Sequence, residues 1–496
     1  MYMGPMPSTF LFINPFDNIR KEKYRMLKNK IAIIGAGSIV FCSTLLNDIF
    51  NVDELDGFEI ALMSPTKSKI DRMKNYADKI IAESGLNTKI YATTDRRDAL
   101  KDAKYVILLF QVGGMEAFGH DYEIPLKYGV DQCIADSLGP GGVFRLLRST
   151  AVLKGIEEDI EELCSGAYVL NYVNPMGAVC TFLGRHTNMN FVGLCHGVQT
   201  TMDLIAGYTD TPKDEIDYVA AGINHMAWFL KLEHNGRDLY PLLRERIEDP
   251  AYYMNEKVRG EVMRHSGYFM TESTGHLSEY LPWFRKNKHA LETYCDMPDF
   301  GGASGAYYKF SKEIQEKYEY KDVFALETGK LEPRSKEYCS YIIEAIETGR
   351  LFKLNGNVLN RGYITNLPNN ACVEVPMIVD RLGLQPIVIG DLPPHLAAMN
   401  QSNISVQSLA ADAVINADPE LAFWAIAMDP LTSSVLTLEQ IRNMTIEMFD
   451  AQAKWLPDFE GKSLKKLHII SVPDNTVPAD VPVDPALAIN SRFGKL

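Results

Sequence analysis

Ile31-Ala-Ile-Ile-Gly-Ala-Gly-Ser-Ile-Val40 is the stretch that decides the fold of this chain. Its first four residues form a continuous apolar run, which is typical of a strand buried on both faces of a parallel sheet. The run leads through Gly35-x-Gly37-Ser38 into a helical pattern that extends to about Phe50. This order predicts a dinucleotide site, because the glycines allow a tight turn and the helix N-terminus attracts pyrophosphate. Val40 stands where the usual pattern has a third glycine, so an ordinary turn between a strand and a helix is the alternative.

The alternation of strands and helices continues up to about residue 200. Apolar runs typical of strands recur, with room for a helix between most of them, at Phe58–Met63, Lys89–Ala92, Tyr105–Phe110, Ala167–Val173 and Asn190–Leu194. This spacing predicts an α/β fold with a Rossmann-like, doubly wound parallel sheet.

Beyond residue 200 the alternation weakens. Ile223–Leu232 and Ala371–Val379 resemble strands, 358–367 resembles a loop, and helical patterns dominate 335–348 and 396–455. We therefore expect a second, α+β domain and an architecture like that of lactate and malate dehydrogenases. The expected parts are an N-terminal extension (1–28), a dinucleotide-binding domain (29–199), a substrate, metal and oligomerisation domain (200–460) and a C-terminal tail (461–496).

Composition excludes several classes of protein. A chain of 496 residues exceeds the ~250–300 residues at which a single core stops growing. Its 50 basic and 64 acidic residues give a net charge of −14, which argues against nucleic-acid binding. No apolar run is long enough to span a membrane. Eight cysteines without a CxxC pair, together with no signal peptide, predict reduced thiols and a cytoplasmic location.

The cofactor is expected to be NAD, with NADP as an open alternative. The end of the second strand usually supplies a carboxylate to the adenosine ribose, and here that place holds Met63-Ser-Pro-Thr-Lys67. Ser64 and Lys67 would suit a 2′-phosphate. The residues expected to contact the cofactor are Gly35, Ala36, Gly37, Ser38, Ile39, Ser64 and Lys67.

Polar residues follow the later strands, at the sheet edge where open α/β folds bind ligands. Asn174 can orient a hydroxyl group, although a turn residue before Pro175 is the alternative. Cys195-His196 follows the next strand and His225 comes 30 residues later. A thiolate and an imidazole brought together would bind a divalent ion and leave positions open for substrate oxygens. Either residue alone is more often structural.

Two further segments carry groups for proton transfer. Asp136 immediately precedes Gly139-Pro-Gly-Gly142, where a simple turn is the alternative. A second segment concentrates Glu272, His276, Glu279 and Tyr280, which suggests a general base without identifying it, and a polar surface loop is the alternative.

The combined motifs resemble glycoside hydrolase family 4, and within it the melibiase-type α-galactosidases. The similarity extends over about residues 29–457. The motifs that carry it are Gly35-Ala-Gly-Ser, Asp136-Ser-Leu-Gly-Pro-Gly-Gly, Asn171-Tyr-Val-Asn-Pro-Met, Gly193-Leu-Cys-His-Gly-Val-Gln, Gly222-Ile-Asn-His, Thr271-Glu-Ser, Pro282-Trp-Phe and Asn366-Leu-Pro-Asn-Asn-Ala-Cys-Val-Glu-Val.

The resemblance implies hydrolysis of α-glycosides, most of all α-galactosides, by a mechanism outside that of paired carboxylates. The sugar would be oxidised at C3 by NAD or NADP, deprotonated at C2 and cleaved by elimination. Water addition and re-reduction would complete the cycle. Mn²⁺ or another divalent metal would act as a Lewis acid on the sugar oxygens. We expect a small glycoside as substrate and a homodimer or homotetramer.

The resemblance also implies a role for each site residue. Cys195 and His225 resemble the metal ligands, Asn174 the substrate-binding asparagine and His196 the acid beside the metal cysteine. Asp136 occupies a position that tunes the base. The base itself is expected to be Glu272, with His276 and Tyr280 as alternatives.

Two observations define the remaining alternatives. Gly197 stands where melibiase-type members have Ser and resembles α-glucosidase and α-glucuronidase or α-galacturonidase members, whereas His196 argues against a 6-phospho substrate. An NAD-dependent 2-hydroxy-acid dehydrogenase is the competing class of enzyme, and it has no need for the pair Cys195 and His225. A non-catalytic nucleotide sensor is a more distant alternative.

Overall fold

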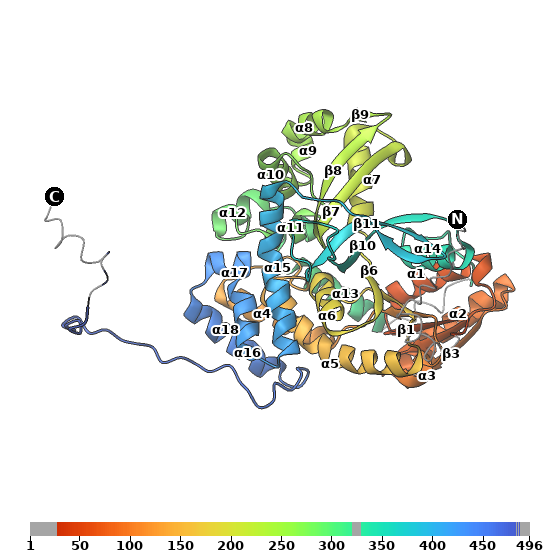
Figure 1. Ribbon diagram of the computed structural model, residues 1–496, viewed down its shortest axis with the longest axis horizontal. Helices are drawn as coiled ribbons and strands as arrows, with labels where there is room; N and C mark the ends of the chain where they lie inside the picture. Colours follow the sequence, from red (N-terminus) through yellow and green to blue (C-terminus); the bar gives the residue numbers. More distant parts are fainter. Residues whose placement is uncertain (1–26, 320–328, 483, 485, 487–496) are drawn as a thin grey trace, which may run out of the picture. The chain divides into compact units, whose positions relative to one another are not determined.

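The computed structural model describes residues 27–319, 329–482, 484 and 486 (Figure 1). Most of the extension expected at 1–28 therefore lies outside the described residues. The chain divides into two compact units, Met1–Leu464 and Lys465–Leu496. The described residues of the second unit form no helix or strand, and their side chains are exposed.

A parallel sheet forms the first half of the large unit, as expected. Its order is β3-β2-β1-β4-β5-β6. Ile33 of β1 lies beside Leu62 of β2 and Ile107 of β4, so apolar side chains fill the centre of the sheet. The strands are β1 (Lys30–Ile34), β2 (Glu59–Met63), β3 (Lys89–Thr93), β4 (Tyr105–Leu108), β5 (Tyr168–Asn171) and β6 (Asn190–Gly193).

The sheet continues without interruption into an antiparallel half. Beyond β6 the order is β10-β11-β7-β8-β9, and β12 pairs with β11. These strands are β7 (Ile216–Ile223), β8 (Met226–His234), β9 (Arg237–Asp238), β10 (Phe352–Leu359), β11 (Cys372–Asp380) and β12 (Gly383–Pro386).

Two buried asparagines of β10 supplement the sheet where backbone pairing is sparse. Asn357 lies opposite Gly193 of β6, where the two halves meet, and its amide nitrogen donates to the Gly193 carbonyl at 3.3 Å. Asn355 donates to the Ala220 carbonyl of β7, within the antiparallel half, at 2.7 Å. Side-chain amides therefore tie β10 to both β6 and β7.

The structure corrects one expectation about strands. The strand expected at Ile223–Leu232 begins only at Met226, because Asn224 and His225 form the turn of a hairpin between β7 and β8. Asn224-His225 carries no Gly-Pro or Asn-Gly signal that would mark this turn. The loop expected at 358–367 is present from residue 360 on, after β10 ends at Leu359.

Helices surround the sheet (Figure 1). One hydrophobic core runs through both halves. Buried residues of β1, β11 and α16 belong to that single core, so it crosses the boundary expected near residue 200. No helix of the described residues is long and apolar enough to span a membrane. The helices are α1 (Ile39–Phe50), α2 (Lys67–Ser84), α3 (Arg96–Leu100), α4 (Gly114–Tyr128), α5 (Gly139–Leu163), α6 (Met176–His186), α7 (Gly197–Thr209), α8 (Tyr240–Glu248), α9 (Pro250–Tyr253), α10 (Lys257–Ser266), α11 (Thr274–Tyr280), α12 (Lys288–Tyr294), α13 (Ala306–Glu319), α14 (Tyr338–Thr348), α15 (Pro394–Ile415), α16 (Pro419–Ala427), α17 (Pro430–Val435) and α18 (Leu438–Gln452).

Candidate functional site

The glycine turn between β1 and α1 has the geometry that a dinucleotide needs. Gly35 has a φ of 101°, and a Cβ atom added there would lie 2.6 Å from the carbonyl oxygen of Leu109. Ser38, the N-cap of α1, makes no side-chain capping bond. A turn that is too crowded for any residue but glycine lets a pyrophosphate group approach the backbone closely. The uncapped N-terminus of the helix leaves backbone amides free to bind that group. The turn residues Gly35, Ala36, Gly37, Ser38 and Ile39 thus lie together at the carboxyl end of β1.

Ser64 and Lys67 differ in their relation to this turn. A Cβ atom on Gly37 would lie 3.3 Å from the Ser64 hydroxyl, so Ser64 contacts the turn. Lys67 forms an ion pair with Asp71 at 2.6 Å on the exposed side of α2. The lysine beside the turn is Lys69, whose Cβ would lie 3.2 Å from that added atom. The sequence alone did not reveal which lysine of α2 faces the turn.

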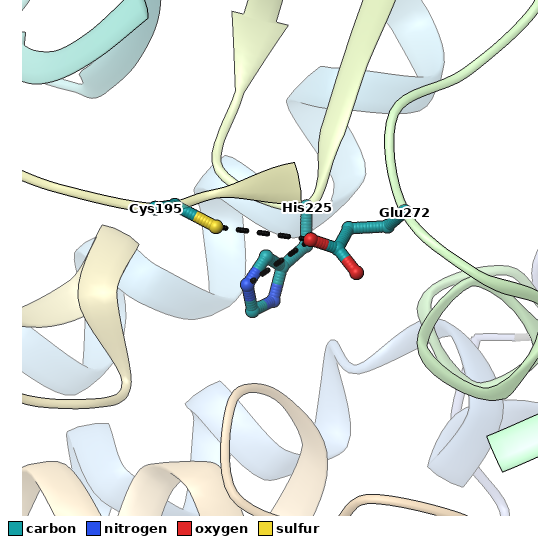
Figure 2. Close-up of side chains that lie close together, drawn as sticks. All are labelled: Cys195, His225 and Glu272. Carbon is teal, nitrogen blue, oxygen red and sulfur yellow. Dashed lines mark hydrogen bonds and ion pairs between the residues drawn. The ribbon is translucent and has the colours of Figure 1, made fainter. Parts of the chain in front are cut away.

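Three residues distant in sequence converge on one point (Figure 2). Cys195 follows β6, His225 lies in the hairpin turn after β7, and Glu272 precedes α11. The Cys195 Sγ and the His225 Nε2 each lie 3.7 Å from the Glu272 Oε1. One ligand atom from each residue lies within 4.8 Å of the others.

The backbone holds two of these residues in an uncommon conformation. His225 has a φ of 62° and Glu272 a φ of 87°, in the left-handed region that side-chain-bearing residues rarely adopt. Such positions concentrate at functional sites, where the surrounding structure imposes them.

Neighbouring groups orient each member of the cluster. The Tyr280 hydroxyl lies 3.2 Å from the His225 Nδ1, and the His276 Nδ1 lies 3.2 Å from the Glu272 Oε2. The Gly197 amide donates to the Cys195 sulfur at 3.4 Å. The side chains of the segment 272–280 that were expected to act as a base, Glu272, His276 and Tyr280, therefore all join the cluster.

The electrostatics of the cluster suit a divalent cation. Burial, together with the carboxylates of Glu272 and Glu374, raises the pKa of the Cys195 thiol well above its usual value. Burial lowers the pKa of His225. Burial alone would raise the pKa of Glu272, but the charges of His225 and His276, together with those of Arg259 and His196, outweigh it and lower the pKa. A bound dication would deprotonate the thiol and compensate the carboxylate, so the donor set fits a metal ion.

A second group of side chains surrounds Asp136. Its Oδ1 accepts from the Ser137 hydroxyl at 2.6 Å, and its Oδ2 accepts from the Asn174 amide nitrogen at 3.1 Å. The Arg145 Nη1 lies 3.3 Å from the same Oδ2. The charge of Asp136 also acts on the pKa of His225, after burial, Glu272 and His276, and on the pKa of Tyr280, after burial and Glu279. This group therefore lies near the cluster of Cys195, His225 and Glu272.

Arg145 was missed by the analysis of the sequence. The residue is 6% exposed and its guanidinium carbon lies 5.5 Å from the centre of the Phe118 ring, yet its Nε and Nη1 have no hydrogen-bond partner. Its contact with Asp136 is an ion pair without hydrogen-bond geometry. Arg148, one turn later in α5, is instead bound by Asp121 at 2.5 Å. Nothing in the local sequence distinguishes these two arginines.

His196 and Glu279 make their hydrogen bonds and ion pairs with residues outside the cluster of Cys195, His225 and Glu272 and outside the group around Asp136. His196 is the N-cap of α7, its side chain is 58% exposed, and its Nδ1 lies 3.4 Å from the Glu337 Oε1. The hydrogen bond to Glu337 raises the pKa of His196. Glu279 is buried and accepts the backbone amides of residues 133–135, so it holds the loop that leads to Asp136.

Comparisons with known proteins cover both halves of the sheet. The sequence model described as "Family 4 glycosyl hydrolase" matches residues 30–210, and that of the "Family 4 glycosyl hydrolase C-terminal domain" matches residues 220–432. An α-galactosidase of Rhizobium meliloti (strain 1021) is 41% identical over 88% of this chain and 90% of its own. An α-galactosidase of Bacillus subtilis (strain 168) is 38% identical over 87% of this chain and 100% of its own.

A solved structure shares the fold. A 6-phospho-α-glucosidase from gut microorganisms, in complex with NAD and Mn²⁺, is 19% identical and has a TM-score of 0.70. It covers 87% of this chain and 99% of its own.

Proposed function

The chain belongs to glycoside hydrolase family 4, and from this membership we propose that it hydrolyses α-galactosides with the help of a nicotinamide dinucleotide and a divalent metal ion. The observation that carries the proposal is the convergence of Cys195, His225 and Glu272 within a chain whose α-galactosidase relatives match nearly its whole length. A 2-hydroxy-acid dehydrogenase would not need this convergence.

The residues that would hold the two cofactors follow strands of the same sheet. The turn from Gly35 to Ile39 and the adjacent Ser64 would hold the dinucleotide, and Cys195 and His225 would hold the metal. When bound, the nicotinamide supplies reversible oxidation of the sugar at C3 and the metal supplies Lewis acidity at the sugar oxygens.

The protein groups around the metal cluster would orient the sugar and move its protons. The Asn174 amide nitrogen is held by Asp136, so its amide oxygen is left to accept a hydrogen bond from a sugar hydroxyl. Glu272 and His276, which lie 3.2 Å apart, would together supply the base for the C2 proton. His196, whose pKa is raised by Glu337, is suited to give a proton to the leaving oxygen.

The test is cleavage of p-nitrophenyl α-galactoside in D₂O by metal-free protein reconstituted with NAD and Mn²⁺. We expect cleavage that stops on chelation, returns with Mn²⁺, accumulates no reduced cofactor and places deuterium at C2 of the product. Paired carboxylates never break the C2–H bond, so they would leave C2 unlabelled. Cleavage without cofactor and without label would refute the proposal, and net formation of NADH would favour the dehydrogenase.

One observation favours a second substrate class, the α-galacturonides. The Nε and Nη1 of the buried Arg145 have no hydrogen-bond partner beside Asp136, and a carboxylate is the group that a guanidinium pairs with best. The positive charge of Arg145 is already paired with the carboxylate of Asp136. We therefore propose the neutral α-galactosides as the preferred substrates and the α-galacturonides as the alternative. The ratio of kcat/KM for p-nitrophenyl α-galactoside and α-galacturonide decides between the two.

A further inference from the structure

We propose that Glu272 is a third protein ligand of the metal ion and that Gly197 is the residue that admits its carboxylate to the site. This inference deepens the proposed function and rests on it for the presence of the metal. It assigns the two oxygens of Glu272 different tasks: Oε1 binds the metal, and Oε2 orients His276.

The distances match a shared ion. Three ligands of a tetrahedral ion with ordinary metal–sulfur, metal–nitrogen and metal–oxygen lengths lie roughly 3.4–3.6 Å apart. The Glu272 Oε1 lies 3.7 Å from both the Cys195 sulfur and the His225 Nε2. Figure 2 shows the three side chains pointing toward one another from three separate elements. The Cys195 sulfur and a His225 ring nitrogen lie within 4.8 Å of each other. A small approach of these two side chains would therefore let all three residues bind one ion.

Each of the three ligands is held from behind, as ligands of metal sites usually are. Tyr280 contacts the far nitrogen of the His225 ring, His276 contacts the far oxygen of Glu272, and the Gly197 amide contacts the Cys195 sulfur. A carboxylate that acted only as a base would not need to share this arrangement with Cys195 and His225.

Charge and ligand chemistry also favour three ligands. A buried dication with one thiolate and one neutral imidazole would keep a net positive charge, whereas the carboxylate of Glu272 neutralises it. Thiolate and imidazole favour zinc and other softer ions, and an added carboxylate shifts the preference toward Mn²⁺.

Gly197 makes this approach possible. It is the first residue of α7, and a Cβ atom added there would lie 2.1 Å from the Glu272 Oε1. Any side chain at this position would displace the carboxylate from Cys195 and His225. Gly207, in the same helix, has no atom within 4 Å of an added Cβ and serves as the matched control.

The assignment has a consequence for the base. With Oε1 on the metal, the remaining task of Glu272 is to accept a hydrogen bond from the His276 Nδ1. The His276 Nε2 is then the nitrogen free to take the C2 proton. The carboxylate of Glu272 would orient the imidazole of His276, and the imidazole would accept the proton, as in other catalytic histidines that a carboxylate orients.

The experiment measures Mn²⁺ binding by calorimetry on metal-free protein, without sugar. We expect Glu272→Gln and Gly197→Ala to weaken binding at least tenfold and Gly207→Ala to leave it within twofold. Co²⁺ serves as a second probe: the thiolate-to-cobalt absorption should persist in Glu272→Gln, because Cys195 still binds, while the d–d bands change. Thermal unfolding confirms that each variant is folded.

Two results would overturn the inference. Mn²⁺ affinity within twofold of wild type in folded Glu272→Gln would show that Glu272 is no ligand. Weakening in Glu272→Gln without weakening in Gly197→Ala would remove the role of Gly197. The proposed function fails separately, through the absence of α-glycoside cleavage in wild-type protein that binds Mn²⁺ as expected.

Discussion

His196, the residue proposed as the acid, has its pKa set by one neighbouring carboxylate. The Glu337 Oε1 lies 3.4 Å from its Nδ1, and this contact raises the pKa of the imidazole. A general acid works only below its pKa, so a raised pKa extends activity toward alkaline pH. We expect Glu337→Gln to move the alkaline fall of kcat/KM to lower pH, as a pH profile of both proteins would show. An unchanged alkaline limb would exclude His196 as the acid.

Arg145 is expected to act on the bound sugar through Asp136. Its positive charge holds the carboxylate that in turn fixes Asn174. We expect Arg145→Met to lower kcat/KM for the α-galactoside by about tenfold, equivalent to ~1.4 kcal/mol of transition-state stabilisation. Arg145→Lys should recover part of the loss because it restores the charge. Full activity of a folded Arg145→Met protein would contradict this role.

Arg148, in the same helix α5 as Arg145, forms a buried ion pair that stabilises the packing of helices. It joins α5 to α4 through Asp121 and to α18 through Gln452, with all three side chains fully buried. Arg148→Met would leave the Asp121 carboxylate without its countercharge. We expect the free energy of unfolding to fall by about 3–5 kcal/mol, measured by urea denaturation. A loss below ~1 kcal/mol would show that water or Gln452 compensates.

The β1–α1 turn and the start of α2 together determine the choice of dinucleotide. No carboxylate follows β2, and Lys69 packs beside Gly37 while Lys67 is engaged by Asp71. We expect NADP to bind at least as well as NAD. Lys69→Ala should weaken NADP alone by about tenfold, since a charge-assisted contact contributes ~1.5–3 kcal/mol.

Titration of both dinucleotides into wild-type, Lys69→Ala and Lys67→Ala protein tests this. Lys67→Ala is the matched control and should change neither affinity. A preference of wild-type protein for NAD by tenfold or more would contradict the prediction.

The parts of the fold and site that follow from short stretches of sequence were predictable. The run Ile31–Ile34 with Gly35 and Gly37 predicts a buried strand and its turn, and the parallel sheet is confirmed. The hairpin turn at His225 was not predictable, because Asn224-His225 carries no strong turn signal and the flanking residues continue an apolar pattern.

Features that depend on packing between distant segments could not be predicted from the sequence. The clash that a side chain at Gly197 would make with Glu272 joins positions 75 residues apart, and only the fold brings them together. The same holds for Arg145 and Arg148, which look alike in sequence and differ only in what α4 and α18 place against them.

At the scale of the whole molecule, the two compact units differ in how much they contribute to stability. Leu464 is buried, whereas the described side chains from Lys465 onward are exposed. We expect a chain that ends at Leu464 to keep its unfolding temperature within about 1 °C, because exposed residues contribute little. Differential scanning calorimetry of both lengths measures this, and a fall of several degrees would mean that the tail packs on the large unit.

The asparagines of β10 have a consequence for how the enzyme moves. Asn355 and Asn357 tie the strand to β7 and β6 through buried carbonyls, and parting them would leave those carbonyls without partners. A hinge needs a boundary that few contacts cross. The strand that leads to Cys195 and the strand that leads to the hairpin at His225 are both tied to β10. We therefore expect Cys195 and His225 to keep their separation when a sugar binds, with no hinge between them.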